Sequence, residues 1–219
     1  MSELKAQLVE AALGHVVFDG WSDVTFRAAV ADSGIDPAVA RGLCPRGALD
    51  LAVAFHKAGD AEMAARMATE DMSDLRYSEK VARAVQIRLE VIPDKEAVRR
   101  GTTLFALPQN SVEGGQLIWG TADAIWTALG DSSDDLNWYT KRAILSGVYS
   151  STILFWLGDD SLDDQATWAF IDRRIADVMT FEKVKSKVRQ SALLKPLLAG
   201  PEWLAAQIKA PKSADLPGG

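Results

Sequence analysis

DLNWYTKR, residues 135–142, precedes a run of uncharged residues, which includes the fifteen from Ala143 to Leu157. Two aromatic rings and two cations lie together here, directly behind Asp134 and Asp135. These fifteen residues are short of the roughly 20 that a membrane-spanning helix needs. Negative charge is favoured at a helix N-terminus, so the two aspartates suit the first turn. The stretch therefore predicts the capped start of a buried helix.

A helical wheel of residues 138–157 places large apolar side chains on one broad face. They are Trp138, Ile144, Leu145, Val148, Tyr149, Ile153, Phe155 and Trp156. The other side carries small residues, Ser146, Gly147, Ser150 and Ser151. A helix that is apolar or small all round is a buried central helix, and ordinary core packing accounts for this pattern.

The excess of large rings around this helix leaves a second interpretation open. The preceding helix adds Trp119 and Trp126, and rings with N–H groups suit a wide apolar pocket for a lipid or a quinone. We expect Lys141 and Arg142 near the mouth of such a pocket. The predicted lipid-binding residues are Trp119, Ala122, Trp126, Trp138, Leu145, Tyr149 and Ile153.

Nearly every other segment also has helical periodicity, and alternating patterns are absent. The predicted helices are 3–18, 23–32, one from Pro37, 48–71, 78–92, 95–107, 116–129 and 162–188. Gly114-Gly115 is expected to separate two of them, and Ser161 to Asp164 resembles a capping box. The fold class predicted is all-α, with about nine or ten helices.

Composition limits the possible functions. The chain has 219 residues, 48% apolar and 25% charged, which suits one domain or one domain with a small appendage. The net charge of −6 argues against nucleic acid as the main partner. The single Cys44 cannot form an intramolecular disulfide, and neither a signal peptide nor a transit peptide follows Met1. These features predict a soluble cytoplasmic protein.

Motifs for catalysis are missing from the sequence. His15 and His56 are the two histidines, and neither belongs to a Glu-x-x-His pair, the usual di-iron helix motif. There is no Gly-x-Ser-x-Gly elbow, no Walker loop and no zinc spacing. We therefore expect no enzyme activity, no metal and no cofactor other than a bound lipid.

Residues 8–51 resemble the DNA-binding portion of the TetR regulator family. The resemblance rests on the order and spacing of Ala11-Ala12-Leu13, Gly20-Trp21, Thr25-x-Arg27, Ser33-Gly34-Ile35 and Pro45-x-Gly47. It implies a three-helix head with a helix-turn-helix. Where a regulator offers polar and basic side chains, this chain reads Pro37-Ala-Val-Ala-Arg-Gly-Leu. Residues 1–60 carry five cations and eight anions, a net charge of −3 that should repel DNA.

The second half resembles the ubiquinone-biosynthesis accessory proteins, a family with a TetR-like fold. The motif Asn137-Trp138-Tyr139-Thr140-Lys141-Arg142 carries this resemblance, together with Leu107-Pro108 before it and Trp168-x-Phe170 after it. It implies a non-enzymatic protein that binds an isoprenoid quinone precursor and assists the demethoxyubiquinone hydroxylase. A TetR-type transcriptional regulator with a hydrophobic effector pocket is the alternative.

The helix at 162–188 is expected to have two functional faces. Trp168, Ile171, Ile175, Val178 and Met179 share one arc and should pack inward. Phe170 and Phe181 fall on the opposite side with Arg174. The family resemblance implies that the hydroxylase binds near this helix, and a homodimer interface competes for the same residues. The predicted partner-binding residues are Trp168, Phe170, Arg174 and Phe181.

The C-terminal segment combines basic and apolar residues. Segment 182–195 has a net charge of +4, and leucines and a tryptophan follow it. This pattern suits an amphipathic helix on anionic lipid, although a tail folded back over the domain is the alternative. The predicted membrane-binding residues are Lys185, Lys187, Arg189, Leu194, Leu197 and Trp203. We expect a peripheral protein on the inner face of the bacterial cytoplasmic membrane, divided into 1–55 (head), 56–190 (lipid-binding domain) and 191–219 (tail).

Overall fold

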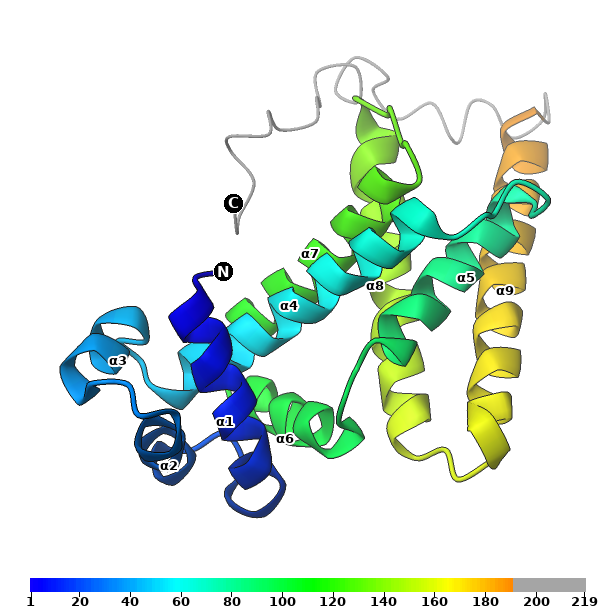
Figure 1. Cartoon of the computed structure of the whole chain (residues 1–219). Helices are drawn as coiled ribbons and strands as arrows, with labels where there is room; N and C mark the ends of the chain where they lie inside the picture. Colours follow the sequence, from blue (N-terminus) through cyan, green and yellow to red (C-terminus); the bar gives the residue numbers. More distant parts are fainter. Residues whose placement is uncertain (191–219) are drawn as a thin grey trace. The chain divides into compact units, whose positions relative to one another are not determined.

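The computed structural model describes residues 1–190, with side chains described up to residue 180. Its elements are α1 (Glu3–Asp19), α2 (Asp23–Ser33), α3 (Pro37–Leu43), α4 (Ala48–Thr69), α5 (Tyr77–Glu90), α6 (Lys95–Ala106), α7 (Ser111–Ala128), α8 (Leu136–Leu157), the 3-10 turn η1 (Leu162–Asp164) and α9 (Gln165–Gln190) (Figure 1). Within the described range there are helices and no strands, so the all-α prediction is confirmed. None of these helices is long and apolar enough to cross a membrane.

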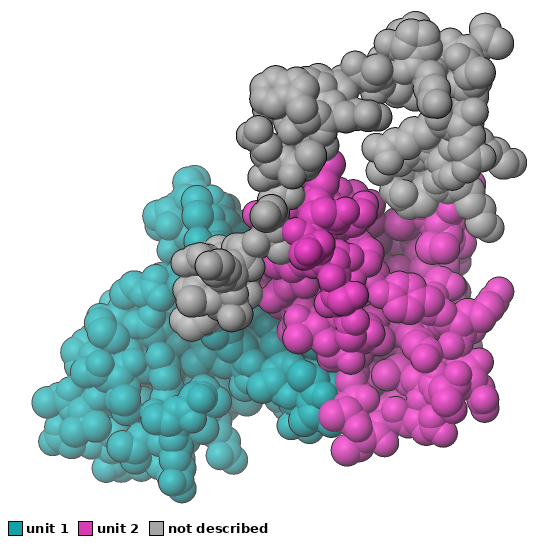
Figure 2. All heavy atoms as spheres, turned by 90° about the horizontal axis from the view of Figure 1, so that it is seen from above, with its two compact units in different colours: residues 1–65, 90–117 teal, residues 66–89, 118–219 magenta. Residues whose placement is uncertain are grey.

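The chain forms two compact units (Figure 2). Unit 1 comprises Met1–Ala65 and Glu90–Leu117, and the described part of unit 2 comprises Arg66–Leu89 and residues 118–190. Helices α4 and α7 therefore each begin in unit 1 and end in unit 2. The boundaries predicted at residues 55 and 190 stay predictions.

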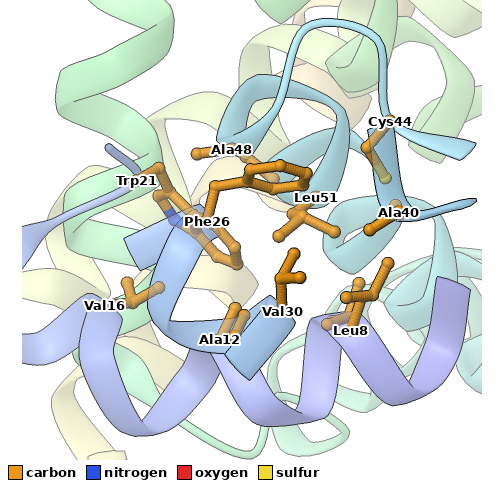
Figure 3. Packing of buried hydrophobic residues seen from close by; sticks show 14 of the residues in the cluster. Leu8, Ala12, Val16, Trp21, Phe26, Val30, Ala40, Cys44, Ala48 and Leu51 are labelled. Atoms are coloured by element: carbon orange, nitrogen blue, oxygen red, sulfur yellow. The ribbon is translucent and has the colours of Figure 1, made fainter. Parts of the chain in front are cut away.

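Unit 1 is built around the three-helix head. Ser22 caps α2 by accepting the Thr25 N–H, and Asp36 caps α3 by accepting two backbone N–H groups. Gly34 ends α2 in the left-handed conformation (φ 66°), which a glycine adopts without strain. Figure 3 shows apolar side chains of α1, α2 and α4 converging on one core. Its members include Leu8, Ala12, Val16, Trp21, Phe26, Val30 and Leu51.

Helix α6 completes the core of the head. The indole N–H of Trp21 donates to the carbonyl oxygen of Ala97 at 3.0 Å, which links residues 76 positions apart. Ala97 is fully buried in the same cluster, and Leu104 and Phe105 pack against it. The core of the head therefore includes side chains of α6, a helix that lies within the predicted lipid-binding domain (56–190).

Gly114 and Gly115 do not separate two helices, and this prediction was wrong. Helix α7 begins at Ser111 and runs through both glycines. A Cβ at position 114 would lie 2.8 Å from the Cβ of Phe105, whereas one at position 115 would meet nothing within 4 Å. Gly114 thus lies where α6 and α7 approach closely. A glycine fits inside α7 at this position because there is no room for a Cβ beside Phe105.

The connection from α8 to α9 also differs from the prediction, because Ser161 and Asp164 do not form a capping box. Both Asp163 (φ 51°) and Asp164 (φ 54°) take the left-handed conformation, so α9 begins only at Gln165. Ser161 and Asp159 satisfy the start of α9: the Ser161 hydroxyl accepts the backbone N–H of Ala166 at 2.9 Å, and Asp159 Oδ2 accepts the backbone N–H of Thr167 at 2.8 Å and the Thr167 hydroxyl at 2.5 Å. Hydrogen bonds from Thr167 and then Ser161 hold the pKa of Asp159 well below its usual range.

Candidate functional site

Helix α8 places the predicted lipid-binding side chains inside unit 2. Asp135 caps the helix by accepting the Asn137 N–H at 2.8 Å, as its position in the sequence predicted. Along the buried side of α8 lie Trp138, Leu145, Tyr149 and Ile153, each less than 8% exposed. Helix α7 contributes Ala122 and Trp126, which are buried, and Trp119, which is half-buried.

Aromatic contacts join α5, α7 and α8. The rings of Trp119 and Trp138 lie 6.0 Å apart between centroids, and those of Tyr77 and Trp126 lie 5.9 Å apart. Tyr139 contacts Trp138 edge-on at 4.8 Å. Offset and edge-on contacts of this kind are favourable beyond the area that they bury. The structure thus brings Trp119 and Trp138 into direct contact, with Tyr139 against Trp138, and it places Tyr77 against Trp126.

Helix α5 supplies two residues that the sequence did not single out. Tyr77 contacts Trp126, and the guanidinium carbon of Arg88 lies 5.9 Å from the centroid of the Tyr149 ring. Arg88 is 3% exposed. The signal for it was present, since Arg88 falls seven residues after Val81 and three after Val85, on the apolar stripe of its helix.

A network of charged side chains links the start of α8 to α7 and to the loop between the two helices. Arg142 pairs with Asp123 of α7 at 2.5 Å and with Asp131 of the connecting loop at 3.2 Å. Lys141 donates to Asp131 at 2.6 Å and to Ser133 at 2.8 Å. Arg142 does not lie at an open mouth, because two aspartates and the Trp138 ring, 4.0 Å from its guanidinium carbon, enclose it at 3% exposure.

Asp131 is the centre of this network. Burial alone would raise the pKa of its carboxyl, but hydrogen bonds from Lys141, Ser133 and Arg142 together outweigh burial and lower the pKa to about 2. The carboxylate is therefore ionised at neutral pH. With Lys141, Arg142, Asp123 and Asp131 all charged, the network has two cations and two anions and no net charge.

Several buried polar atoms near the aromatic residues lack a hydrogen-bond partner. Among the described residues these include Trp126 Nε1 on α7 and the hydroxyls of Ser146 and Thr152 on α8. Buried polar groups in folded proteins almost always have a partner, so each exception requires an explanation. Two of the three residues, Trp126 at 8% and Thr152 at 0% exposure, are more than nine-tenths buried.

The predicted partner surface on α9 is only partly assembled as expected. Phe170 is not an isolated ring, because it stacks on Phe155 of α8 with centroids 4.5 Å apart and planes 11° apart. Arg174 lies 5.2 Å from the Phe170 centroid and pairs with Asp177 at 2.7 Å. The expectation that Phe155 faces inward was wrong, since it is 37% exposed. The structure therefore joins Phe155, Phe170 and Arg174 in one half-exposed cluster.

The other α9 residues fall into three groups. Ile171 and Ile175 are buried as expected, whereas Met179 is 44% exposed and was wrongly assigned to the inward face. Trp168 is half-buried, and its indole N–H donates to the carbonyl oxygen of Asp163 at 2.8 Å. Phe181 lies outside the described side chains, as do the predicted membrane-binding residues Lys185, Lys187 and Arg189; Leu194, Leu197 and Trp203 lie outside the described residues.

The surface of α3 in the head is poor in groups that could bind DNA. Pro37, Ala38 and Val39 are exposed, and the one cation of the helix is Arg41. The guanidinium carbon of Arg41 lies 4.7 Å from the centroid of Phe26, so the charge is held against the head's own ring.

The fold is that of the TetR-type regulators. A TetR transcriptional regulator from Nitrosomonas europaea superimposes with a TM-score of 0.66, covering 80% of this chain and 97% of that chain at 17% sequence identity. A likeness at this level of identity shows the fold alone. The predicted TetR-like architecture is therefore confirmed.

Sequence comparison identifies the relatives. Residues 112–182, which contain α7 almost entirely and all of α8, match the COQ9 family model. The probable ubiquinone biosynthesis protein coq9, mitochondrial, of Dictyostelium discoideum is 30% identical over 86% of this chain and 64% of its own length. COQ9-A of Xenopus laevis is 33% identical over 81% of this chain and 58% of its own. The predicted resemblance is confirmed: the chain is similar in sequence to the COQ9 proteins, and these relatives are named as ubiquinone biosynthesis proteins.

The expected location on the inner face of the bacterial cytoplasmic membrane is contradicted. The COQ9 relatives are named as mitochondrial proteins. The expectation rested on the absence of a transit-peptide pattern after Met1. Because the chain spans less than two thirds of the length of these relatives, its first residue does not carry that conclusion.

Proposed function

We propose that this protein is a non-enzymatic accessory protein of ubiquinone biosynthesis that binds an isoprenoid quinone intermediate and assists the demethoxyubiquinone hydroxylase. The observation that carries the proposal is the coincidence of two features. The segment that matches the COQ9 model, residues 112–182, is also the segment that holds the buried tryptophans of α7 and α8.

The chemistry of these helices suits a prenylated ligand. Trp119, Trp138 and Tyr149 offer broad apolar surfaces for isoprene units, and burial of apolar area is the main source of affinity for such a ligand. The charged network beside them is neutral overall, so no surplus charge has to be desolvated when an apolar ligand binds.

The cluster of Phe155, Phe170 and Arg174 is the surface that we assign to the hydroxylase. Aromatic rings and arginine are enriched where protein interfaces contribute most of their affinity. A homodimer would compete for this cluster, and co-purification of the hydroxylase with the wild-type chain and with Phe170→Ala distinguishes the two. If Phe170→Ala retains the hydroxylase but loses dimerisation, the cluster is a dimer interface.

Association with a membrane surface is part of the proposal, because an enzyme that handles polyprenyl quinones works at a lipid bilayer. The basic segment 182–195 and the leucine-rich residues after it are the part of the sequence assigned to this contact. Flotation of the full chain with vesicles that contain anionic lipid, compared with neutral vesicles, tests the assignment. Equal recovery with both kinds of vesicle rules out the electrostatic contact.

A lipid analysis of the purified chain tests the main proposal. The full chain is expressed in cells that make ubiquinone, and native mass spectrometry followed by lipid extraction identifies what co-purifies. We expect an isoprenoid lipid on the wild-type chain and less of it on Trp138→Ala. Leu154→Ala is the matched control, since Leu154 is 63% exposed on the same helix. The proposal fails if the folded wild-type chain carries no such lipid.

A further inference from the structure

The indole N–H of Trp126 makes no hydrogen bond within the protein. The ring is fixed on two sides: it lies 5.9 Å from the ring of Tyr77, and the Lys141 ammonium lies 5.5 Å from its centroid. Lys141 is itself held by Asp131 and Ser133. Yet Trp126 is 8% exposed and its Nε1 has no hydrogen-bond partner.

Three other indole N–H groups donate to acceptors within the protein. Trp21 donates to the carbonyl oxygen of Ala97, Trp156 to the carboxylate of Asp164, and Trp168 to the carbonyl oxygen of Asp163. A buried donor without a partner is costly and requires an explanation, and a ligand that supplies the missing acceptor is one such explanation. Because an indole can only donate, that ligand must present an acceptor atom.

The charges around Trp126 favour a neutral acceptor over an anionic one. The Lys141 ammonium lies over the Trp126 ring, and Asp131 already neutralises it at 2.6 Å. Arg142 is likewise paired, with Asp123 and Asp131. A phosphate or a carboxylate would therefore enter a region that offers no unpaired cation, and its desolvation would be uncompensated. A ketone oxygen requires no counter-charge.

We propose that Trp126 Nε1 donates a hydrogen bond to a ring ketone oxygen of a prenylated quinone, and so selects this head group over other prenyl lipids. This inference rests on the proposed function and deepens it. Trp126 is then a specificity-determining residue: the rings of α7 and α8 bind the isoprene chain, and the N–H of Trp126 identifies the quinone.

Trp126→Phe tests the assignment, because it removes the N–H and keeps an aromatic ring. The full chain is titrated with ubiquinone bearing two prenyl units, with a prenyl hydrocarbon of similar length that lacks a head group, and with the corresponding prenyl phosphate. We expect Trp126→Phe to weaken quinone binding about fivefold to tenfold and to leave hydrocarbon binding unchanged. Trp119→Phe, a half-buried tryptophan of the same helix, is the matched control and should not change the preference between quinone and hydrocarbon.

A second measurement uses the unaltered protein. The Nε1–H proton of Trp126, assigned by its loss in Trp126→Phe, should shift downfield in the NMR spectrum when the quinone is added and should not shift with the hydrocarbon. This readout does not depend on the stability of the variant. An unchanged Nε1–H resonance at saturating quinone overturns the inference.

The possible results separate the two proposals. If the wild-type chain binds quinone but Trp126→Phe binds it equally well, or loses quinone and hydrocarbon alike, the N–H does not select the head group and the proposed function still stands. Tighter binding of the prenyl phosphate than of the quinone overturns the choice of a neutral acceptor. If the wild-type chain binds none of the three probes, the proposed function itself fails.

Discussion

Replacing Asp131 with asparagine measures how much the charged network contributes to the stability of unit 2. The substitution keeps the shape of the side chain and removes its charge. In the native protein the carboxylate is 2% exposed and accepts hydrogen bonds from Lys141, Ser133 and Arg142. Arg142 would keep Asp123 as a partner, and Lys141, which is 34% exposed, could turn toward water. The loss in the free energy of unfolding should therefore be smaller than the 3–5 kcal/mol that is typical when a fully buried ion pair is broken.

The pKa of Asp131 gives the magnitude. Its value falls from an ordinary 3.8 to about 2, which corresponds to a contribution of about 2 kcal/mol to the free energy of unfolding at neutral pH. Because the folded state has the lower pKa, this stabilisation is complete above about pH 4 and is lost as the pH falls toward 2. At about pH 3, roughly half of it should remain.

Urea unfolding followed by circular dichroism measures this contribution. We expect Asp131→Asn to lower the free energy of unfolding by about 2 kcal/mol at pH 7, and the gap from wild type to narrow to about 1 kcal/mol at pH 3. Asp134→Asn, an exposed carboxylate in the same loop, is the control and should change stability by less than about 0.5 kcal/mol. A gap at pH 7 no larger than that of the control, or one that stays constant on acidification, would refute the reasoning.

Two further predictions concern the backbone. Gly114→Ala should lower the free energy of unfolding by about 1–3 kcal/mol, because the new Cβ meets Phe105 at 2.8 Å. The Cβ of Gly115→Ala meets nothing within 4 Å, so this variant should be neutral or more stable by up to about 1 kcal/mol. Thermal unfolding of the two variants checks the difference, and equal melting temperatures contradict it. Asp159→Ala should weaken the first turn of α9, since the helix loses the acceptor for the Thr167 N–H. Hydrogen exchange at the first turn of α9 measures the effect, and unchanged protection there excludes the capping role.

Features that depend on neighbours in sequence could be predicted. The helix from Leu136 to Leu157 is specified by its own periodicity and by Asp135, whose side chain accepts the backbone N–H of Asn137 and so caps the helix. The buried position of Trp138 and Tyr149 follows from the same wheel. Local signals of this kind set the type of an element and its inner face, and they do so before any partner is known.

Features that depend on a distant partner could not be predicted. The sequence gives no indication that Arg142 meets Asp123, or that Phe155 turns outward to stack on Phe170, because each pairing spans a loop whose path is set by the fold. Gly114 was taken for a helix end because a glycine weakens a helix, and the compensating approach of Phe105 becomes visible only in three dimensions.

The distribution of polar groups is the reason for assigning the proposed function to unit 2 and not to the head. In the head, Arg41 lies against the ring of Phe26, and the Trp21 N–H is bonded to the carbonyl oxygen of Ala97, so these groups stabilise the fold. In unit 2 the charges of Asp123, Asp131, Lys141 and Arg142 also cancel one another, but the donor of Trp126 and the hydroxyl of Thr152 remain buried and without a partner. A core selected for stability alone would have apolar residues at these two positions, since both groups add a desolvation cost and no hydrogen bond. Their presence beside the aromatic residues of the COQ9-matching segment is what a binding site for an apolar ligand with a few acceptor atoms requires.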